Sequence, residues 1–143
     1  MAKWLLLTYR LPREPSAARV SVWRKLKRLG ALLYHDSVWV LPATVATREQ
    51  MRWLAVEIVE LHGESTCWES QIPDEQAERT LIKQFKAVAE AAYEELLVEL
   101  KAADADLRSL GRRYQELVAQ DYFGCALKAK VREQLASRRG KQS

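Results

Sequence analysis

Cysteine, histidine and glycine are scarce in this chain of 143 residues, and their scarcity argues against several kinds of site. The two cysteines, Cys67 and Cys125, lie far apart in the sequence, so we expect neither a disulfide framework nor a cysteine-based metal centre. The five glycines form no loop of the kind that cradles phosphates. The sequence therefore predicts no bound metal and no cofactor.

Side chains in a catalytic arrangement are equally hard to find. His35 and His62 are the only histidines, and each lies near the end of an expected element, where a solvated or hydrogen-bonded role is more common than catalysis. The neighbouring acids Glu94 and Glu95 have the pattern of solvated charges on a helix rather than of a paired acid and base. We therefore assign no catalytic residue and expect the chain not to be an enzyme.

Long apolar runs are also missing. No run approaches the ~18 apolar residues that a membrane-spanning helix needs. The apolar run after Lys3 is too short for the hydrophobic part of a secretion signal, and no small-residue cleavage site follows it. Because 48% of the residues are hydrophobic and 29% are charged, we expect a soluble, globular, cytoplasmic protein.

Basic residues, in contrast, are concentrated near the N-terminus. Residues 1–42 contain eight Lys or Arg and two acidic residues, a net charge of +6, whereas the rest of the chain contains 15 basic and 17 acidic residues. The overall charge of +4 thus hides a strongly basic N-terminal part. Such a local excess makes a polyanion a reasonable partner.

Apolar periodicity and turn residues predict an α+β protein. The expected elements are, in order, a strand at 3–10 buried on both faces, a helix at 16–29, strands at 31–35 and 38–41, a helix at 47–62 and a strand at 65–72. Ser16 and Thr47 are the expected helix caps, and Asp36 with Ser37 is the expected hairpin turn. This order is that of a ferredoxin-like βαββαβ core, which we assign to residues 1–72.

Only helices are expected in the remaining region, 73–143. A long amphipathic helix to about Ala103 and a second helix from Leu107 predict an antiparallel helical hairpin. The segment 121–124 interrupts the second helix, and a basic helix then follows, with a frayed end at 138–143. We expect this C-terminal region to pack on the core or on a partner.

The large apolar residues have expected places in this arrangement. Trp39 and Leu6 are predicted core residues of adjacent strands, and Trp23 is expected at a dimer contact or in a half-buried position. Tyr122 and Phe123 are expected to anchor the helix interruption to the sheet or to a partner chain. Two helical stripes and the open edges of the sheet predict a homodimer. These stripes contain Leu81, Phe85 and Val88, and Leu110, Tyr114 and Leu117.

The first helix is the candidate DNA-binding element. Phosphate contacts need only positive charge at a suitable spacing, and one side of this helix is rich in Lys and Arg. The alternative to a DNA-binding role is that these charges form an ordinary solvated helix face. The candidate DNA-binding residues are Arg10, Arg13, Arg19, Arg24, Lys27 and Arg28.

Four segments together resemble the N-terminal domain of the chromate-resistance regulator (ChrB) family. They are Trp4–Leu7, Pro12–Ser16, Val22–Ala31 and Val38–Pro42. Residues 53–58 and 121–124 are also similar, so that the resemblance covers most of the chain. It implies a transcriptional regulator that acts at a chromate-responsive operon, with a ferredoxin-like core followed by helices.

The resemblance also marks two departures. In a more distantly similar family, the small CRISPR-associated nuclease, a metal-binding Asp ends the first strand, and Tyr9 and Arg10 stand there in this chain. Longer ChrB proteins carry a C-terminal domain thought to serve in sensing, which this sequence lacks. The chain is therefore expected to be either a fragment or a stand-alone module, and direct sensing of chromate is not expected of it.

Three functions remain open at this point, in decreasing order of support. The first is a DNA-binding or DNA-associated regulatory module that forms a homodimer and does not act on a membrane. The second is a dimerisation or interaction module with no nucleic-acid contact of its own. The third is a metal-dependent nuclease.

Overall fold

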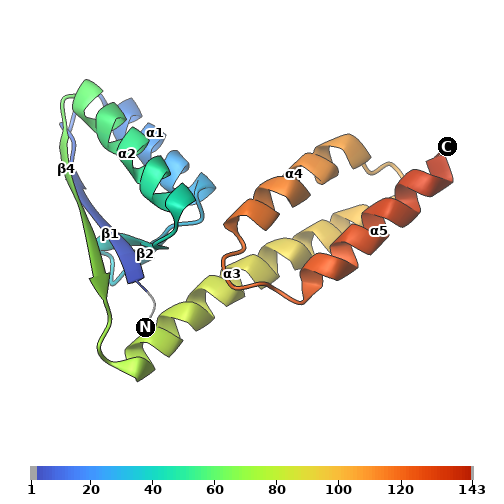
Figure 1. The fold of residues 1–143 in the computed structure, drawn as a ribbon. Coiled ribbons are helices and arrows are strands. Elements are labelled where there is room, and N and C mark those ends of the chain that lie inside the picture. Colours follow the sequence, from blue (N-terminus) through green and yellow to red (C-terminus); the bar gives the residue numbers. More distant parts are fainter. Residues whose placement is uncertain (1–2, 143) are drawn as a thin grey trace. The chain divides into compact units, whose positions relative to one another are not determined.

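The computed structural model describes residues 3–142 and divides the chain into two compact units, Met1–Glu75 and Gln76–Ser143. Six elements form the first unit (Figure 1): β1 (Lys3–Arg10), α1 (Ser16–Arg28), β2 (Leu32–Tyr34), β3 (Val38–Pro42), α2 (Val45–Glu60) and β4 (Glu64–Gln71). Three helices follow: α3 (Glu75–Leu100), α4 (Leu107–Gln120) and α5 (Leu127–Gln142). The predicted α+β class, with a ferredoxin-like core and C-terminal helices, is confirmed.

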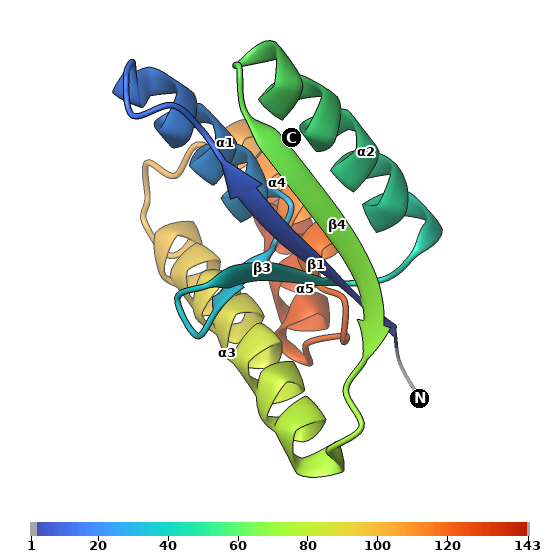
Figure 2. The same ribbon diagram turned by 90° about the vertical axis from the view of Figure 1, so that its left-hand side faces the viewer.

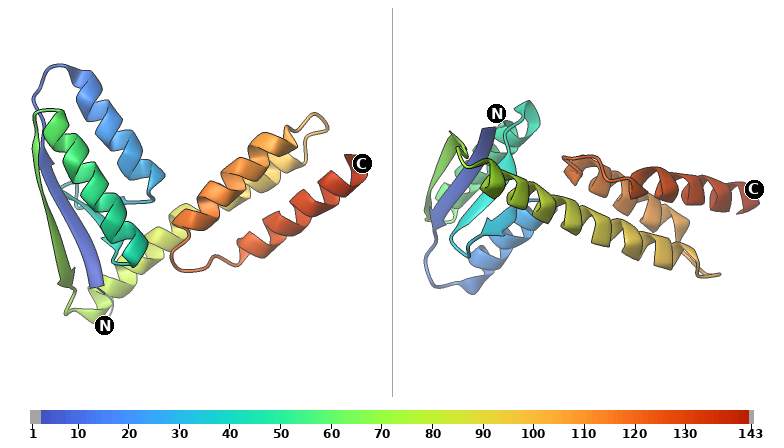
Figure 3. Two further views of the ribbon diagram at one scale, coloured as in Figure 1. Left: turned by 45° about the horizontal axis from the view of Figure 1, so that its top comes forward. Right: turned by 90° about the horizontal axis from the view of Figure 1, so that it is seen from below.

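The sheet is antiparallel and has the strand order β2-β3-β1-β4, as expected of a ferredoxin-like core. Figures 2 and 3 show α1 and α2 side by side on one face of this sheet. Successive residues of β1 point to opposite faces, and both Trp4 and Leu5 are buried. The prediction of a first strand buried on both faces therefore holds at Trp4 and Leu5, whereas Leu6 and Thr8, on the same face as Trp4, are only half-buried.

The register between β1 and β3 corrects one predicted core residue. Leu7 lies opposite Trp39, and both are buried, whereas Leu6 lies opposite Val40 and is only half-buried. On its other side Leu6 faces Trp68 of β4, whose side chain is exposed. Leu6 thus points to the opposite face of the sheet from Trp39, because neighbouring residues of a strand alternate.

Helix α1 begins differently from the expectation and ends as expected. Pro15 occupies the N-cap position and makes no side-chain capping bond, so Ser16 is a first-turn residue and not the cap. At the other end Gly30 adopts a φ of 80°, and the amides of Gly30 and Ala31 donate to the carbonyls of Lys27 and Leu26. This is a Schellman motif, in which glycine relieves the strain of a left-handed residue.

The β2–β3 hairpin turns one residue earlier than predicted. Its two turn residues are His35 and Asp36, both with positive φ, and the amide of Ser37 donates to the carbonyl of Tyr34. Two consecutive positive φ values define a type I′ turn, whose twist matches that of the flanking strands.

Helix α2 is capped by Thr44 rather than by Thr47. The amide of Thr47 donates to Oγ1 of Thr44 at 3.0 Å, and the amide of Thr44 donates to Oγ1 of Thr47 at 2.8 Å. Thr47 is thus the partner in the capping box, and its hydroxyl also donates to the carbonyl of Pro42. The helix ends at Glu60, and His62 just beyond it has a positive φ of 66°. A Cβ on the following Gly63 would lie 2.4 Å from the carbonyl oxygen of Arg10, so this position requires glycine.

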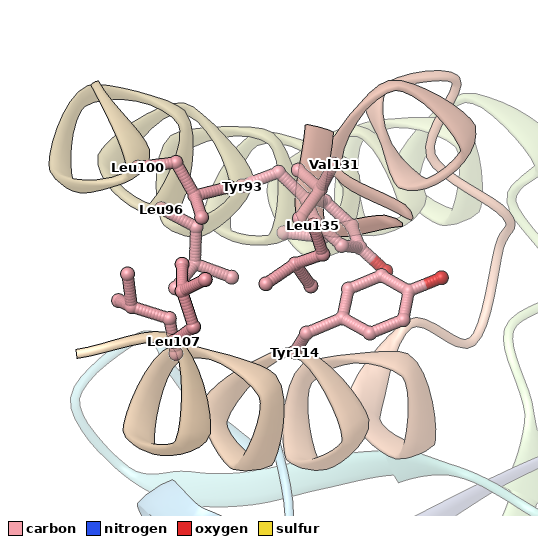
Figure 4. Packing of buried hydrophobic residues seen from close by; sticks show 9 residues of the cluster. Tyr93, Leu96, Leu100, Leu107, Tyr114, Val131 and Leu135 are labelled. Carbon is pink, nitrogen blue, oxygen red and sulfur yellow. The ribbon is translucent and has the colours of Figure 1, made fainter. Parts of the chain in front are cut away.

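The second unit has its own hydrophobic core between its three helices. Figure 4 shows side chains of all three helices converging on one cluster. Tyr93, Leu96 and Leu100 come from α3, Leu107 and Tyr114 from α4, and Val131 and Leu135 from α5. Each of these side chains is buried. The third helix therefore completes the core of the expected hairpin.

The breaks between these helices are fixed by two aspartates. The carboxylate of Asp106 accepts from the amide of Ser109 and caps α4. The carboxylate of Asp121 accepts from the amide of Cys125 and, at 3.0 Å, from the hydroxyl of Tyr93. Burial raises the pKa of that phenol, and its hydrogen bond to the carboxylate raises it further. The interruption after α4 is thus tied to α3.

Two details of the helical region differ from the expectation. The rings of Tyr122 and Phe123 contact Phe85 of α3, with centroids 6.4 and 5.8 Å apart, so they anchor the interruption to a helix of the same unit. Helix α5 continues to Gln142, beyond the predicted frayed start at Arg138. The guanidinium of Arg138 donates to the carbonyls of Leu100 and Ala102, at the end of α3 and just after it.

The apolar stripe of α3 is also shifted from the predicted one. Val88 is 56% exposed, and the buried stripe passes through Ala89 and Tyr93 instead.

Within residues 3–142, no helix has the length and apolar character required to span a bilayer.

Candidate nucleic-acid interface

A groove of about 800 Å³ lies in the first unit, between α1 and the strands β1, β2 and β3. It is bordered by the N-terminal two thirds of α1 and by the loop that precedes this helix. The lining residues are Leu7, Tyr9, Arg10, Leu11, Ser16, Arg19, Val20, Trp23, Arg24, Leu33, Ser37 and Trp39. A volume of this size falls in the range of small-ligand sites.

Apolar side chains form the floor and one wall of the groove. Leu7 and Trp39 are buried at its floor. Val20 and Trp23 of α1 and Leu33 of β2 also line it, and their side chains are between 43% and 49% exposed. The groove therefore exposes apolar surface, which indicates a ligand that is itself partly apolar.

The structure brings three of the six candidate residues to this groove, places two more beside it, and turns the sixth away from it. Arg10, Arg19 and Arg24 line the groove. Arg13 is exposed in the loop before α1, and Lys27 is exposed on α1 beyond the groove.

Arg28 lies on another side of the helix. With Trp53 and Glu57 of α2 it lines a smaller cavity of about 270 Å³. The basic residues of α1 therefore do not form one row, because the helix turns them toward two different neighbours.

Few carboxylates neutralise the groove. Arg10 forms an ion pair with Glu64 at 3.7 Å, but both side chains are largely exposed, so the pair is weak. Arg13, Arg19 and Arg24 make no ion pair within the part of the chain that the structure describes. Their positive charge is available to an anion from outside.

Lys27 makes cation–π contacts with two tryptophans of the groove. The ammonium of Lys27 lies 5.6 Å from the centroid of the Trp23 ring and 5.9 Å from that of Trp39. Cation–π attraction at such distances favours a fixed position for the half-exposed Trp23 ring. Lys25, in contrast, forms an ion pair with Glu57 of α2 and helps to hold the two helices together.

The side chains considered for chemistry lie elsewhere. Cys67 is exposed on β4, and partial burial of its sulfur together with the nearby carboxylate of Glu69 raises the pKa of its thiol. A raised pKa lowers the fraction of reactive thiolate at neutral pH. Glu69 itself accepts a two-pronged hydrogen bond from Arg48, which lowers the pKa of that carboxyl. Among residues 3–142, no three His, Cys, Asp or Glu side chains are grouped to hold a metal ion.

Sequence reasoning did not find the apolar half of the groove. No sequence pattern marked Tyr9, Val20 or Leu33 as binding-site residues, and Trp39 was predicted only as a core residue. These residues come together only because β2, β3 and β1 pair in one sheet and α1 packs against it. The one available signal was Trp23, a large apolar residue next to basic residues on a helix.

The family model described as "Protein ChrB, N-terminal" matches residues 19–107. The chain belongs to this family. The match includes Arg19, Arg24, Lys27 and Arg28 of α1, and extends through α3 to the start of α4. The resemblance drawn from the sequence is therefore confirmed.

A curated relative supports the same assignment. The chain is 32% identical over 119 residues to Protein ChrB of Cupriavidus metallidurans (strain ATCC 43123 / DSM 2839 / NBRC 102507 / CH34). The aligned region is 78% of this chain but 36% of the relative, so the chain spans about a third of the length of that protein. No solved structure matches the chain.

Proposed function

We propose that this chain is the DNA-binding module of a transcriptional regulator of the chromate-resistance type, which works by binding and not by catalysis, in the cytoplasm. The observation that carries the proposal is the group of exposed arginines on α1 and the preceding loop, Arg13, Arg19 and Arg24, which have no carboxylate partner in the described residues. Membership of the ChrB N-terminal family supports a regulatory role.

The physical basis of the proposal is release of counterions from DNA. Each phosphate that an arginine neutralises frees condensed counterions, so binding strengthens as salt is lowered. Such contacts orient a protein on the duplex without reading its sequence. The structure supplies three exposed cations for such contacts, Arg19 and Arg24 on α1 and Arg13 in the preceding loop.

The alternative is an interaction module without its own nucleic-acid contact. Its supporting observation is the outer face of α2, where Val45, Trp53, Val56 and Val59 are between 51% and 81% exposed. Exposed apolar residues on one helix are typical of surfaces that meet another protein.

A salt titration of DNA binding separates the two. We expect the full chain to bind duplex DNA from upstream of its own gene, with log K falling as log salt rises. Replacing Arg13, Arg19 and Arg24 by Ala is expected to weaken binding to specific and unrelated duplexes alike. The slope is expected to become shallower by up to about 0.9 for each phosphate that the variant no longer neutralises.

The matched control removes three exposed cations of the helical unit, Lys83, Lys86 and Lys130, and is expected to leave the slope unchanged. Thermal melting of both triple variants checks that they are folded. An unchanged slope in a folded arginine variant, or no duplex binding by the parent chain at low salt, would favour the interaction module. Repeating the parent titration with chromate tests whether this chain alone responds to it.

A further inference from the structure

We propose that the groove between α1 and the β2–β3 hairpin holds an unstacked nucleotide of single-stranded DNA, with its base against Trp23 and the apolar floor and its phosphates against the arginines. This proposal rests on the proposed DNA-binding function and names the form of DNA that the groove takes. Its first support is the combination of an apolar interior with a cationic rim.

Shape and lining favour a flat, partly apolar ligand. The groove has a volume of about 800 Å³, and Leu7 and Trp39 close its floor. The Trp23 ring is 49% exposed at its wall, which leaves ring surface for stacking. A base stacks on an aromatic ring whatever its sequence, because every base has a π-face.

Charge favours an anion attached to that flat group. Arg10, Arg19 and Arg24 all line the groove, and of these only Arg10 has a carboxylate partner in the described residues. Aromatic and cationic side chains in one groove are the combination that single-strand binding proteins use for bases and backbone. A free inorganic anion would satisfy the arginines but would leave the apolar surface exposed.

The extent of the charge favours a strand over a single free nucleotide. Arg13 lies in the loop just before α1, and Lys27 lies one turn beyond Trp23, so positive charge continues past both ends of the groove. One phosphate cannot use all of these cations, whereas neighbouring phosphates of a strand can reach them. Paired duplex DNA cannot place a base in the groove, because its bases remain stacked.

The test compares two tryptophans of similar exposure. Trp23 lines the groove, whereas Trp68 is 56% exposed on β4 and is not part of the lining. Fluorescence anisotropy of labelled single-stranded and duplex oligonucleotides of equal length is measured with the full chain. The variants are Trp23→Ala, Trp23→Phe and Trp68→Ala, with circular dichroism to confirm folding.

We expect Trp23→Ala to weaken single-strand binding at least about fivefold and to change duplex binding less than about twofold. Trp23→Phe is expected to recover most of the affinity, and Trp68→Ala to bind like the parent. Equal single-strand binding by Trp23→Ala and the parent would overturn the groove proposal while leaving duplex binding intact. Equal weakening in Trp23→Ala and Trp68→Ala would also overturn it.

A competition experiment tests the preference for a strand. Deoxyadenosine monophosphate is added to the parent bound to the single-stranded oligonucleotide. We expect displacement only at concentrations far above those at which the unlabelled strand competes. If the mononucleotide displaces the labelled strand at the same concentration as the unlabelled strand does, the preference for a strand is contradicted. The groove is then a site for a free nucleotide. Absence of single-strand binding by the parent overturns the groove proposal, whereas the proposed duplex binding is decided by the salt titration.

Discussion

Individual residues show where an apolar pattern can be read from sequence and where it cannot. Trp39 is 4% exposed and was predicted to be buried, because it lies between two valines in a short strand. Leu6 was also predicted as a core residue but is only half-buried, because the run from Trp4 to Leu7 is apolar throughout and does not reveal which residues share a face. The register with β3 settles this by placing Leu7 opposite Trp39.

At the residue scale we expect Trp39→Ala to reduce the free energy of unfolding by about 3–5 kcal/mol, because it empties a large buried volume beneath α1. Trp68→Ala, which removes an exposed ring from β4, is the control and is expected to cost less than about 0.5 kcal/mol. Urea unfolding followed by circular dichroism measures both. A Trp39→Ala variant as stable as the parent would contradict the burial of this ring.

At the scale of elements, the kinds of helices and strands were predictable but their ends were less so. Thr44 and Thr47 are both suitable caps, and only the pair of reciprocal bonds shows that α2 begins after Thr44. The end of α5 was placed too early, because the bond from Arg138 to the end of α3 is a contact between segments distant in sequence. Local sequence cannot report such a contact.

The hydrogen bond between Tyr93 and Asp121 gives a prediction about pH. The folded chain holds the phenolic proton more tightly than the unfolded chain, because the pKa of Tyr93 is raised above its ordinary value of 10.0. Its contribution to stability is therefore present below pH 10.0 and disappears as the pH rises through the folded pKa. Tyr93→Phe lacks this contribution at every pH.

We expect Tyr93→Phe to lower the free energy of unfolding by about 1–3 kcal/mol at neutral pH, because it removes a buried bond to a carboxylate. The difference from the parent is expected to shrink in alkaline solution above pH 10.0. Urea unfolding followed by helical circular dichroism across this range measures it. The matched control is Tyr114→Phe, in the same core, because the phenol that donates to Asp121 is that of Tyr93. A constant difference at all pH values would contradict a role for the phenolic proton.

At the scale of the whole molecule, apolar surface is distributed differently from the expectation. Leu81, Phe85, Leu110 and Tyr114 are buried within the chain, so they are not open to a partner. The exposed apolar residues on α2 are the better candidate surface for assembly. All five tryptophans lie in the first unit, which makes tryptophan fluorescence a probe of that unit alone.

We expect the chain to form a homodimer through the outer face of α2, since two-fold pairs are the commonest assemblies. Light scattering at micromolar concentration is expected to give about twice the chain mass of 16.5 kDa. Val56→Glu, which places a charge on an exposed position of α2, is expected to give the monomer mass with unchanged melting at low concentration. Val98→Glu, on the exposed side of α3, is the control and is expected to remain a dimer. A monomeric parent would contradict the prediction.

Sequence alone determined the order of elements, the ferredoxin-like class, the family and the basic character of the N-terminal part. These depend on local periodicity, on turn residues and on composition, all of which are read along the chain. Tertiary structure alone decided that Arg10, Arg19 and Arg24 share a groove with Trp23 while Arg28 faces α2. The physical reason is that a groove is formed by strand register and helix seating, which bring together residues distant in sequence.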